Sequence, residues 1–122
     1  MPKVLVAEDE KALSHALELK LASAGFTVTV VGDGAAALEA ISKEKFDILL
    51  LDLMMPVKDG FGVLKELEEK KIHIPAVVLS NLSQTEDEKK VRELGAVDFW
   101  IKAEISLVEV VNRVKKLLDM PT

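Results

Sequence analysis

The chain of 122 residues contains no cysteine and no tyrosine, and tryptophan occurs only once. Without cysteine there can be no disulfide, no thiolate nucleophile and no zinc–thiolate site. No apolar run approaches the roughly 18 residues that a membrane-spanning helix requires, and the short apolar segment near the N-terminus is too brief for a secretory signal. We therefore expect a cytoplasmic protein, and the lack of cysteine fits a reducing compartment.

An excess of basic charge is also missing. The 16 basic and 21 acidic residues give a net charge of −5, without a basic stripe or an arginine-rich arm. Duplex DNA would repel such a surface, so direct nucleic-acid binding by this chain is not expected. Hydrophobic residues are plentiful at 49%, and the 30% charged residues are mixed in sign. These totals predict one globular domain spanning residues 1–122.

Short apolar segments alternate along the chain with longer amphipathic ones. Strand length and β-branched or bulky apolar content mark the segments 3–7, 27–31, 47–51, 76–80 and 98–101. Helical spacing marks the segments 11–24, 35–42, 61–70, 86–94 and 107–120. This alternation predicts a doubly wound α/β fold, in which helices cover both faces of a five-stranded parallel sheet. Segment 27–31, which alternates threonine with valine, is the expected edge strand.

Polar side chains stand at the ends of four of the predicted strands. Asp52 follows four consecutive apolar residues, although a buried carboxylate needs a counter-charge, a proton or a metal. Glu8 and Asp9 follow the first strand, Ser80 closes the fourth, and Lys102 follows the fifth. The carboxyl ends of parallel strands meet at one rim, where such sheets bind ligands. Three carboxylates, a hydroxyl and an ammonium are groups that a hard cation and a phosphoryl group require.

This pattern resembles the receiver domains of two-component response regulators. The matching residues are the acidic pair Glu8–Asp9, the D-x-x-M-P-x-x-D-G stretch at 52–60, Ser80, the L-G-A-x-D-F stretch at 94–99, and Lys102. The resemblance covers essentially the whole chain and implies a flavodoxin-like sheet of order 2-1-3-4-5 flanked by five helices. It also implies a signalling switch rather than a metabolic enzyme, catalysing only its own phosphorylation and dephosphorylation.

The resemblance further implies that Asp52 accepts a phosphoryl group from a phosphohistidine on a sensor histidine kinase or a phosphotransfer protein. Asp9 and Asp52 would bind Mg²⁺ directly, and Glu8 would bind it through water. The backbone carbonyl of Met54 would complete the protein's share of the ligands. In this scheme the cation offsets the negative charge of the Asp52 carboxylate and of the phosphoryl group as they approach each other.

Ser80 and Lys102 would hold the remaining phosphoryl oxygens in such a domain. Ser80 would move toward the new group, and the aromatic Phe99 would rotate into the space that it leaves. A downstream protein or output domain would detect the state at the face of the fourth helix, fifth strand and fifth helix, through a shift in population. The same face could bind a second copy of the chain.

The chain departs from the family pattern at three places. Ala103 follows Lys102 where the family usually has a cis proline. A cis bond at a non-proline residue costs about 2.5–4 kcal/mol, so either that strain is tolerated or a trans path aims Lys102 differently. Asn81 replaces the usual alanine or glycine and could narrow access for small phosphodonors. Met54 and Leu82 hold the positions that tune hydrolysis, and neither can orient water by hydrogen bonding, so we expect slow self-dephosphorylation.

Two other functions remain open from the residues. The first is a receiver-like protein-interaction module that works without phosphorylation, with Asp52 silent; Ala103 and Asn81 favour it slightly. The second is a Mg²⁺-dependent phosphohydrolase acting through an aspartyl phosphate. It is the weaker of the two, because Met54 stands where a second acid would assist the leaving group.

Overall fold

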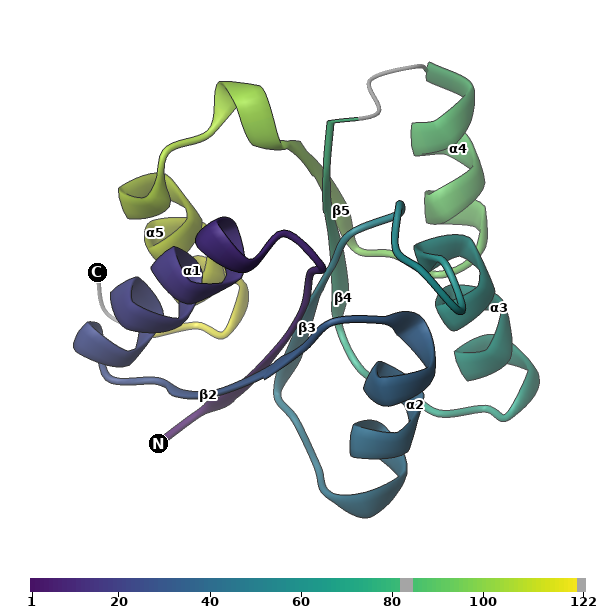
Figure 1. Cartoon of the computed structure of the whole chain (residues 1–122), viewed down its shortest axis with the longest axis horizontal. Coiled ribbons are helices and arrows are strands. Elements are labelled where there is room, and N and C mark those ends of the chain that lie inside the picture. The colour runs from purple at the N-terminus through teal and green to yellow at the C-terminus, as the bar shows by residue number, and fades with distance from the viewer. Residues whose placement is uncertain (82–84, 121–122) are drawn as a thin grey trace.

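Strands and helices alternate along the chain (Figure 1) in a computed structural model that describes residues 1–81 and 85–120. The strands are β1 (Lys3–Ala7), β2 (Thr27–Val31), β3 (Ile48–Leu51), β4 (Ala76–Ser80) and β5 (Asp98–Ile101). The helices are α1 (Lys11–Ser23), α2 (Gly34–Lys43), α3 (Gly60–Glu69), α4 (Thr85–Glu93) and α5 (Leu107–Leu117). A short 3-10 turn, η1 (Lys102–Glu104), follows β5. Leu82, one of the expected tuning residues, lies outside the described residues.

The five strands form one parallel sheet in the order β2-β1-β3-β4-β5, which confirms the predicted fold class. The order reverses between β1 and β3, because the chain proceeds from β1 outward to β2 and then returns to the other side. Ala7 at the end of β1 pairs with Leu51 at the end of β3. The residues that follow these two positions, Glu8 and Asp52, therefore leave the sheet beside each other, where doubly wound sheets bind ligands.

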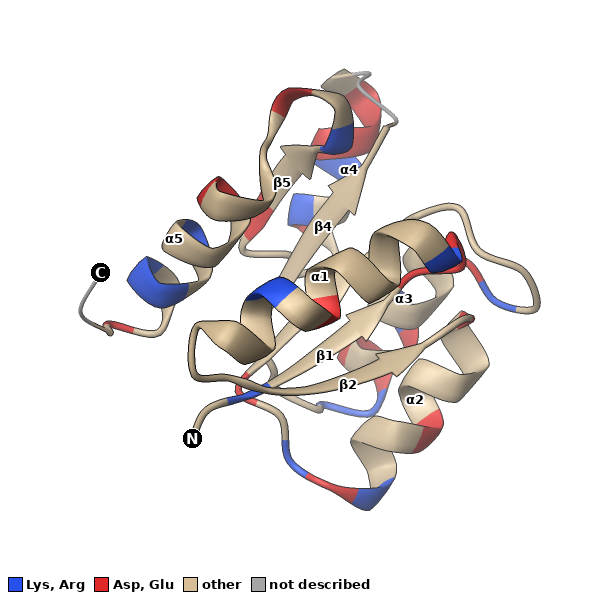
Figure 2. Ribbon diagram, turned by 60° about the vertical axis from the view of Figure 1, so that its left-hand side comes forward, with Lys and Arg blue, Asp and Glu red and all other residues tan. Residues whose placement is uncertain are grey.

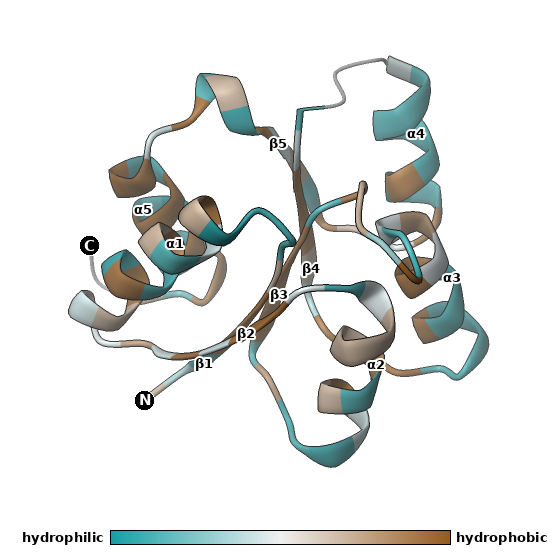
Figure 3. Ribbon diagram, viewed as in Figure 1, coloured by the Kyte–Doolittle hydropathy of each residue, from teal (hydrophilic) through white to brown (hydrophobic). Residues whose placement is uncertain are grey.

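Helices cover both faces of the sheet: α1 and α5 lie on one side, and α2, α3 and α4 on the other (Figure 1). The central strands are hydrophobic along their length (Figure 3), since both of their faces are covered. Alternation along β5 sends Trp100 into the core beneath α1 and α5, and Phe99 toward the helices of the other face. None of the helices in the described part of the chain is long and apolar enough to cross a membrane.

The last helix is shorter than the sequence predicts. Helix α5 begins after Ser106, whose side chain caps the backbone N–H of Glu109, and it ends at Leu117 rather than at residue 120. Asp119 then adopts a left-handed conformation with φ of 56°, and the N–H of Met120 donates to the carbonyl of Lys115 at 2.8 Å. The turn keeps Met120 against the core, so apolar periodicity continues beyond the end of the helix.

Gly60 allows the segment after β3 to fold closely over the end of the sheet. Its N–H donates to the carbonyl of Leu53 at 2.9 Å, as α3 begins. A Cβ atom at this position would lie 2.5 Å from the carbonyl oxygen of Asp52 and 2.8 Å from the Cα of Leu53. Both neighbours are backbone atoms, so a side chain at position 60 must displace the segment that carries Asp52.

We expect Gly60→Ala to lower the free energy of unfolding by about 1–3 kcal/mol, the usual cost of overpacking a close contact. Gly32→Ala is the matched control, because a Cβ there meets nothing within 4 Å and its backbone is not left-handed. Urea unfolding followed by circular dichroism measures both variants. Equal stability of the two variants would contradict the close approach described for Gly60.

Candidate functional site

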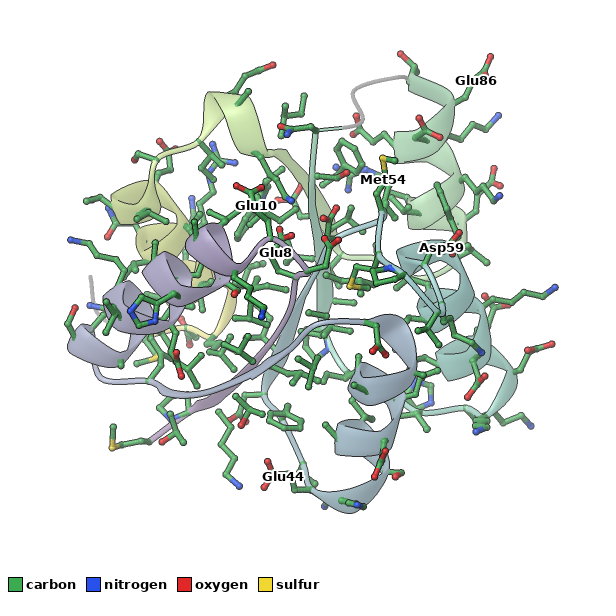
Figure 4. The ribbon with its side chains drawn as sticks, viewed as in Figure 1. Glu8, Glu10, Glu44, Met54, Asp59 and Glu86 are labelled. Carbon is green, nitrogen blue, oxygen red and sulfur yellow. The ribbon has the colours of Figure 1, made fainter. Side chains whose placement is uncertain are left out.

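The predicted rim of the sheet contains a polar hollow of about 320 Å³. Its walls come from the segments that follow β1, β3, β4 and β5, and the residues that line it are Glu8, Asp9, Glu10, Asp52, Met54, Ser80, Asn81 and Lys102. Glu8 and Glu10 lie on the segment that leads into α1, and Met54 lies on the segment that follows β3 (Figure 4). Residues up to 94 positions apart in the sequence thus share one hollow because four strands end there.

Asp52 continues the sheet for one residue beyond β3, since its N–H donates to the carbonyl of Ala7 at 3.0 Å. This bond fixes the direction of the side chain, which is only 7% exposed. Its Oδ1 atom accepts the N–H of Met54 at 3.3 Å, and its Oδ2 atom accepts the ammonium of Lys102 at 2.8 Å. The counter-charge that a buried Asp52 requires is therefore Lys102.

Glu8 is more deeply buried than Asp52, with 3% of its side chain exposed. Its backbone N–H donates to the carbonyl of Val31, so it extends β1 as Asp52 extends β3. The Oε1 atom is ion-paired with Lys102, and the Oε2 atom accepts the N–H of Glu10 at 3.0 Å. Burial raises the pKa of the Glu8 carboxyl, and the hydrogen bonds from Lys102 and Glu10 only partly offset that effect.

The ammonium of Lys102 joins the ends of β1 and β3, because it is ion-paired with both Glu8 and Asp52. Only 11% of the Lys102 side chain is exposed. Burial alone would lower the pKa of this ammonium, but the hydrogen bonds to Asp52 and Glu8 outweigh burial and raise it. Every peptide bond in residues 1–81 and 85–120 is trans, including the bond to Ala103. Of the two paths that the sequence left open, the chain takes the trans one, and Lys102 still points at Asp52.

The donor atoms fit a hard divalent cation. One carboxylate oxygen from each of Glu8, Asp9 and Asp52 lies within 4.8 Å of the others. Oxygen ligands of this kind suit Mg²⁺, which usually takes one or two carboxylates and keeps several waters. Asp9 is exposed and could be reached from solvent. Three carboxylates and the Lys102 ammonium leave two net negative charges, which a divalent cation would neutralise.

Three more residues line the hollow: Ser80 and Met54, which the sequence predicted, and Asn81, which departs from the family pattern. Ser80 ends β4 and is buried, with 1% exposure. Asn81 is exposed beside it and lines the same hollow. Met54 stands at the rim with 64% exposure, so its thioether meets solvent. The structure therefore brings together all of the predicted acceptor, metal and phosphoryl-binding positions.

Phe99 lies apart from this group. It is half-buried and packs against the apolar cluster between the sheet and α2, α3 and α4. Its backbone N–H donates to Asp98 Oδ1 at 2.8 Å, and Asp98 also accepts the indole N–H of Trp100 at 2.9 Å and Arg92 of α4 at 3.1 Å. Burial opposes the charge on Asp98, but these three donors outweigh it and lower the pKa of Asp98.

Sequence reasoning missed three of these contacts. The carboxylate–ammonium pair of Glu8 and Lys102 was not predicted, nor was the contribution of Glu10 to the hollow, although three acids in a row after β1 were visible. The bonds of Asp98 were also missed. Of these bonds, the one from Arg92 depends on how α4 packs beside β5, and the sequence carries no local signal for that packing.

Comparison with known proteins places this geometry in a family. The sequence profile of the response regulator receiver domain matches residues 4–115. The transcriptional regulatory protein PrrA of Mycobacterium tuberculosis is 38% identical over 117 residues, which cover 96% of this chain and 50% of that protein. The transcriptional regulatory protein DltR of Streptococcus agalactiae is 38% identical over 100 residues, covering 82% of this chain and 45% of that protein. The chain thus spans about half the length of the curated relatives it matches.

Solved structures agree with the sequence matches. The receiver domain of the Francisella response regulator 1452 superposes with a TM-score of 0.92 at 35% identity, and the match covers 98% of each chain. The BeF3-activated receiver domain of DrrB superposes with a TM-score of 0.86 at 28% identity, again over 98% of each chain. The whole sheet and its helices are therefore shared with receiver domains.

We expect Lys102→Met to lower the free energy of unfolding by about 3 kcal/mol in metal-free buffer at neutral pH, because it leaves two buried carboxylates without their counter-charge. The matched control is Lys43→Met. Lys43 pairs with Glu39 at 2.7 Å, but both side chains are largely exposed, at 71% and 66%, so this variant should unfold like the wild type. Urea unfolding in the presence of a chelator gives both values. A loss no greater than that of the control would mean that Lys102 does not compensate the buried acids.

Proposed function

Because the chain belongs to the receiver domain family of two-component response regulators, we propose that it is a phosphorylation switch whose acceptor is Asp52. The observation that carries the proposal is the environment of this carboxylate. Asp52 is buried at the end of β3, opens into a polar hollow, and lies among two other acids and one ammonium. A structural aspartate that only ended a strand would need none of these neighbours.

The proposed reaction is transfer of a phosphoryl group from a phosphohistidine on a sensor histidine kinase or phosphotransfer protein. A carboxylate oxygen of Asp52 attacks phosphorus, the phosphorus–oxygen bond forms, and the phosphorus–nitrogen bond breaks with its electron pair passing to the imidazole. The bond from the Asp52 N–H to Ala7 and the contact with Met54 hold the nucleophile in place. The chain turns over no separate substrate in this scheme and so acts as a signalling protein.

We assign the metal positions to Glu8, Asp9, Asp52 and the backbone carbonyl of Met54. Bound Mg²⁺ would supply charge neutralisation between the acceptor and the incoming phosphoryl oxygens. Asp9 is the acid of this group that is exposed to solvent, which suits direct ligation, whereas both oxygens of Glu8 already have partners within the protein. That difference supports a water-mediated role for Glu8.

Lys102 and Ser80 are the proposed partners of the remaining phosphoryl oxygens. The Lys102 ammonium already contacts Asp52 at 2.8 Å, so a small movement would carry it from the carboxylate to a group attached there. Ser80 stands on the neighbouring strand with its side chain in the same hollow. Asn81 and Met54 stand at the rim of the hollow, where they would restrict the entry of small donors and of water.

The proposed response involves Ser80, Phe99 and the adjacent helix α4. Within the described residues, α4 buries only Val91. Much of its surface is hydrophilic (Figure 3) and carries charges of both signs (Figure 2). Its anchoring contacts, Lys90 over the ring of Phe61 and Arg92 to Asp98, come from its second half. A helix held this lightly can shift when Ser80 and Phe99 move, and the face formed by α4, β5 and α5 would show that shift to a partner.

The partners of this face are proposed by class only. The curated relatives are named as transcriptional regulators and are about twice as long as the residues they share with this chain. A downstream protein or an output domain is the proposed reader of the α4, β5 and α5 face, and a second copy of the chain is the other candidate. The residues 1–122 would act as one receiver unit.

We expect incubation with Mg²⁺ and acetyl phosphate, or with a phosphorylated kinase, to add one phosphoryl group to the wild type, as measured by intact mass. Asp52→Asn should gain none, because an amide cannot serve as the nucleophile. Asp59→Asn is the matched control. Asp59 lies in the same segment, but its side chain caps α3 through the N–H of Gly62, so this variant should still be phosphorylated.

Equal labelling of wild type and Asp52→Asn would reject Asp52 as the acceptor. If no donor labels the wild type, the better explanation is a protein-interaction module that works without phosphorylation. The same samples, followed after removal of the donor, give the lifetime of the modified form. Met54 offers no hydrogen bond to a water, so we expect slow loss, and a half-life of seconds would contradict that expectation.

A further inference from the structure

Methionine supplies all of the sulfur in this chain, which has four methionines and no cysteine. Two of them are packed, Met55 against the apolar cluster between the sheet and α2, α3 and α4, and Met120 against the cluster beneath α1 and α5. The other two are exposed, Met1 at 83% and Met54 at 64%. Met1 precedes β1 and so lies at the opposite end of the sheet from the polar hollow. Met54 is therefore the methionine that both meets solvent and lines the hollow.

The backbone holds Met54 beside the proposed acceptor while its side chain stays unpacked. The N–H of Met54 donates to Asp52 Oδ1 at 3.3 Å. Leu53 is only 1% exposed, and its carbonyl accepts the N–H of Gly60 at 2.9 Å. Met55 is half-buried on the other side. Anchors before and after Met54 thus leave its thioether at the mouth of the hollow, on the segment that follows β3 (Figure 4).

An exposed thioether is open to oxidation by peroxides, because the sulfur lone pair can reach the oxidant. The sulfur attacks one oxygen of hydrogen peroxide, a sulfur–oxygen bond forms and the oxygen–oxygen bond breaks. The proton of the transferred oxygen passes to the departing hydroxide, which leaves as water. Sulfur is oxidised by two electrons and the peroxide is reduced by two. Thiol reductants acting through methionine sulfoxide reductases reverse the change.

Oxidation would turn an apolar group at the mouth of the hollow into a hydrogen-bonding one. A thioether is at best a weak acceptor, whereas a sulfoxide is polar and its oxygen accepts hydrogen bonds. The oxidised side chain could hold a water molecule that the thioether does not hold. Asp52 lies two residues earlier and opens into the same hollow, so that water would stand beside a phosphoryl group carried by Asp52.

We propose that Met54 is a site of reversible oxidation by peroxides, and that its sulfoxide shortens the lifetime of the phosphoryl group on Asp52. The inference rests on the proposed function and adds a redox input to the same switch. In the step concerned, the water oxygen bonds to phosphorus, and the bond from phosphorus to the Asp52 oxygen breaks. Its electron pair returns to the carboxylate, and the protons of the water pass to the released phosphate and to solvent.

The first test needs no phosphoryl group. Wild type is treated with dilute hydrogen peroxide, and tandem mass spectrometry of its peptides follows the conversion of each methionine with time. Met55 is the matched control, because it directly follows Met54 but is packed. Met54 should react about fivefold faster or more than Met55 and Met120, since susceptibility follows exposure. Its rate should approach that of N-acetylmethionine in the same tube. A Met54 that reacts no faster than the packed methionines would overturn the modification site.

The second test measures the lifetime of phosphorylated Asp52 by intact mass after removal of the donor, with and without prior peroxide treatment. One hydrogen bond is equivalent to about a fivefold change in rate, so the oxidised wild type should lose its phosphoryl group about fivefold faster. Met54→Leu is the matched control. It retains the other three methionines and the backbone carbonyl at position 54, so peroxide should not change its lifetime. Met54→Gln, whose amide can bind water, should be short-lived without peroxide.

The outcomes separate this inference from the function on which it rests. An equal effect of peroxide on wild type and Met54→Leu would assign the effect to another residue and overturn the proposal. An unchanged lifetime after full conversion of Met54 would overturn it as well. If the wild type accepts no phosphoryl group from any donor, the proposed function fails, and the control of lifetime fails with it. The peroxide rates of Met54 and Met55 would still decide whether Met54 is a modification site.

Discussion

The structure around the sheet rim depends on one electrostatic constraint: three carboxylates converge there, and a single ammonium compensates them. Carboxylates whose oxygens lie within 4.8 Å of one another repel by about 3–4 kcal/mol for each pair at an effective dielectric constant near 20. Two of the three are also buried, which adds a cost of desolvation. Lys102 offsets part of this repulsion, and the residual charge of the group selects for a divalent cation. The chemistry proposed for Asp52 follows from that imbalance.

The fold produces the convergence without any local signal that the acids belong together. Parallel strands begin and end at the same edges, so residues that follow β1, β3, β4 and β5 meet although long helices separate them in the chain. The pairing of Ala7 with Leu51 sets Glu8 beside Asp52. Gly60 lets the next segment turn back over the acceptor without a steric clash. Apolar burial on both faces of the sheet stabilises an arrangement that the charges alone would oppose.

Much of this arrangement could be predicted from the sequence, because the strands show as apolar runs and the site residues stand directly after those runs. Unbroken apolar runs such as residues 48–51 indicate buried parallel strands, and a charged residue directly after such a run must lie at the rim. The end of α5 could not be predicted, because Met120 stays against the core after the helix has stopped. The pairing of Lys102 with Glu8 could not be predicted either. Two carboxylates were within reach of one flexible side chain, and only the three-dimensional structure shows that the ammonium contacts both.

Phe99 marks another limit of sequence reasoning. Strand alternation correctly separates it from Trp100, and the two residues pack on opposite faces of the sheet. Alternation cannot reveal the hydrogen bonds of Asp98. Its carboxylate accepts the backbone N–H of Phe99, the indole N–H of Trp100 and the guanidinium of Arg92 from α4. Of these contacts, the one from Arg92 connects β5 to the lightly held helix α4. They show that the face proposed for partner recognition is organised by polar contacts as well as by packing.

The central claim is that the acids at the ends of β1 and β3 form one site for a divalent cation. Paramagnetic Mn²⁺ tests it directly, because this ion replaces Mg²⁺ at oxygen sites and broadens nearby amide signals in NMR spectra. We expect low Mn²⁺ concentrations to broaden the amide signals of Glu8, Asp9, Asp52 and Met54 first, and excess Mg²⁺ to restore them. Broadening centred on another group of acids, such as Glu86, Asp87 and Glu88 at the start of α4, with the rim unaffected, would contradict it.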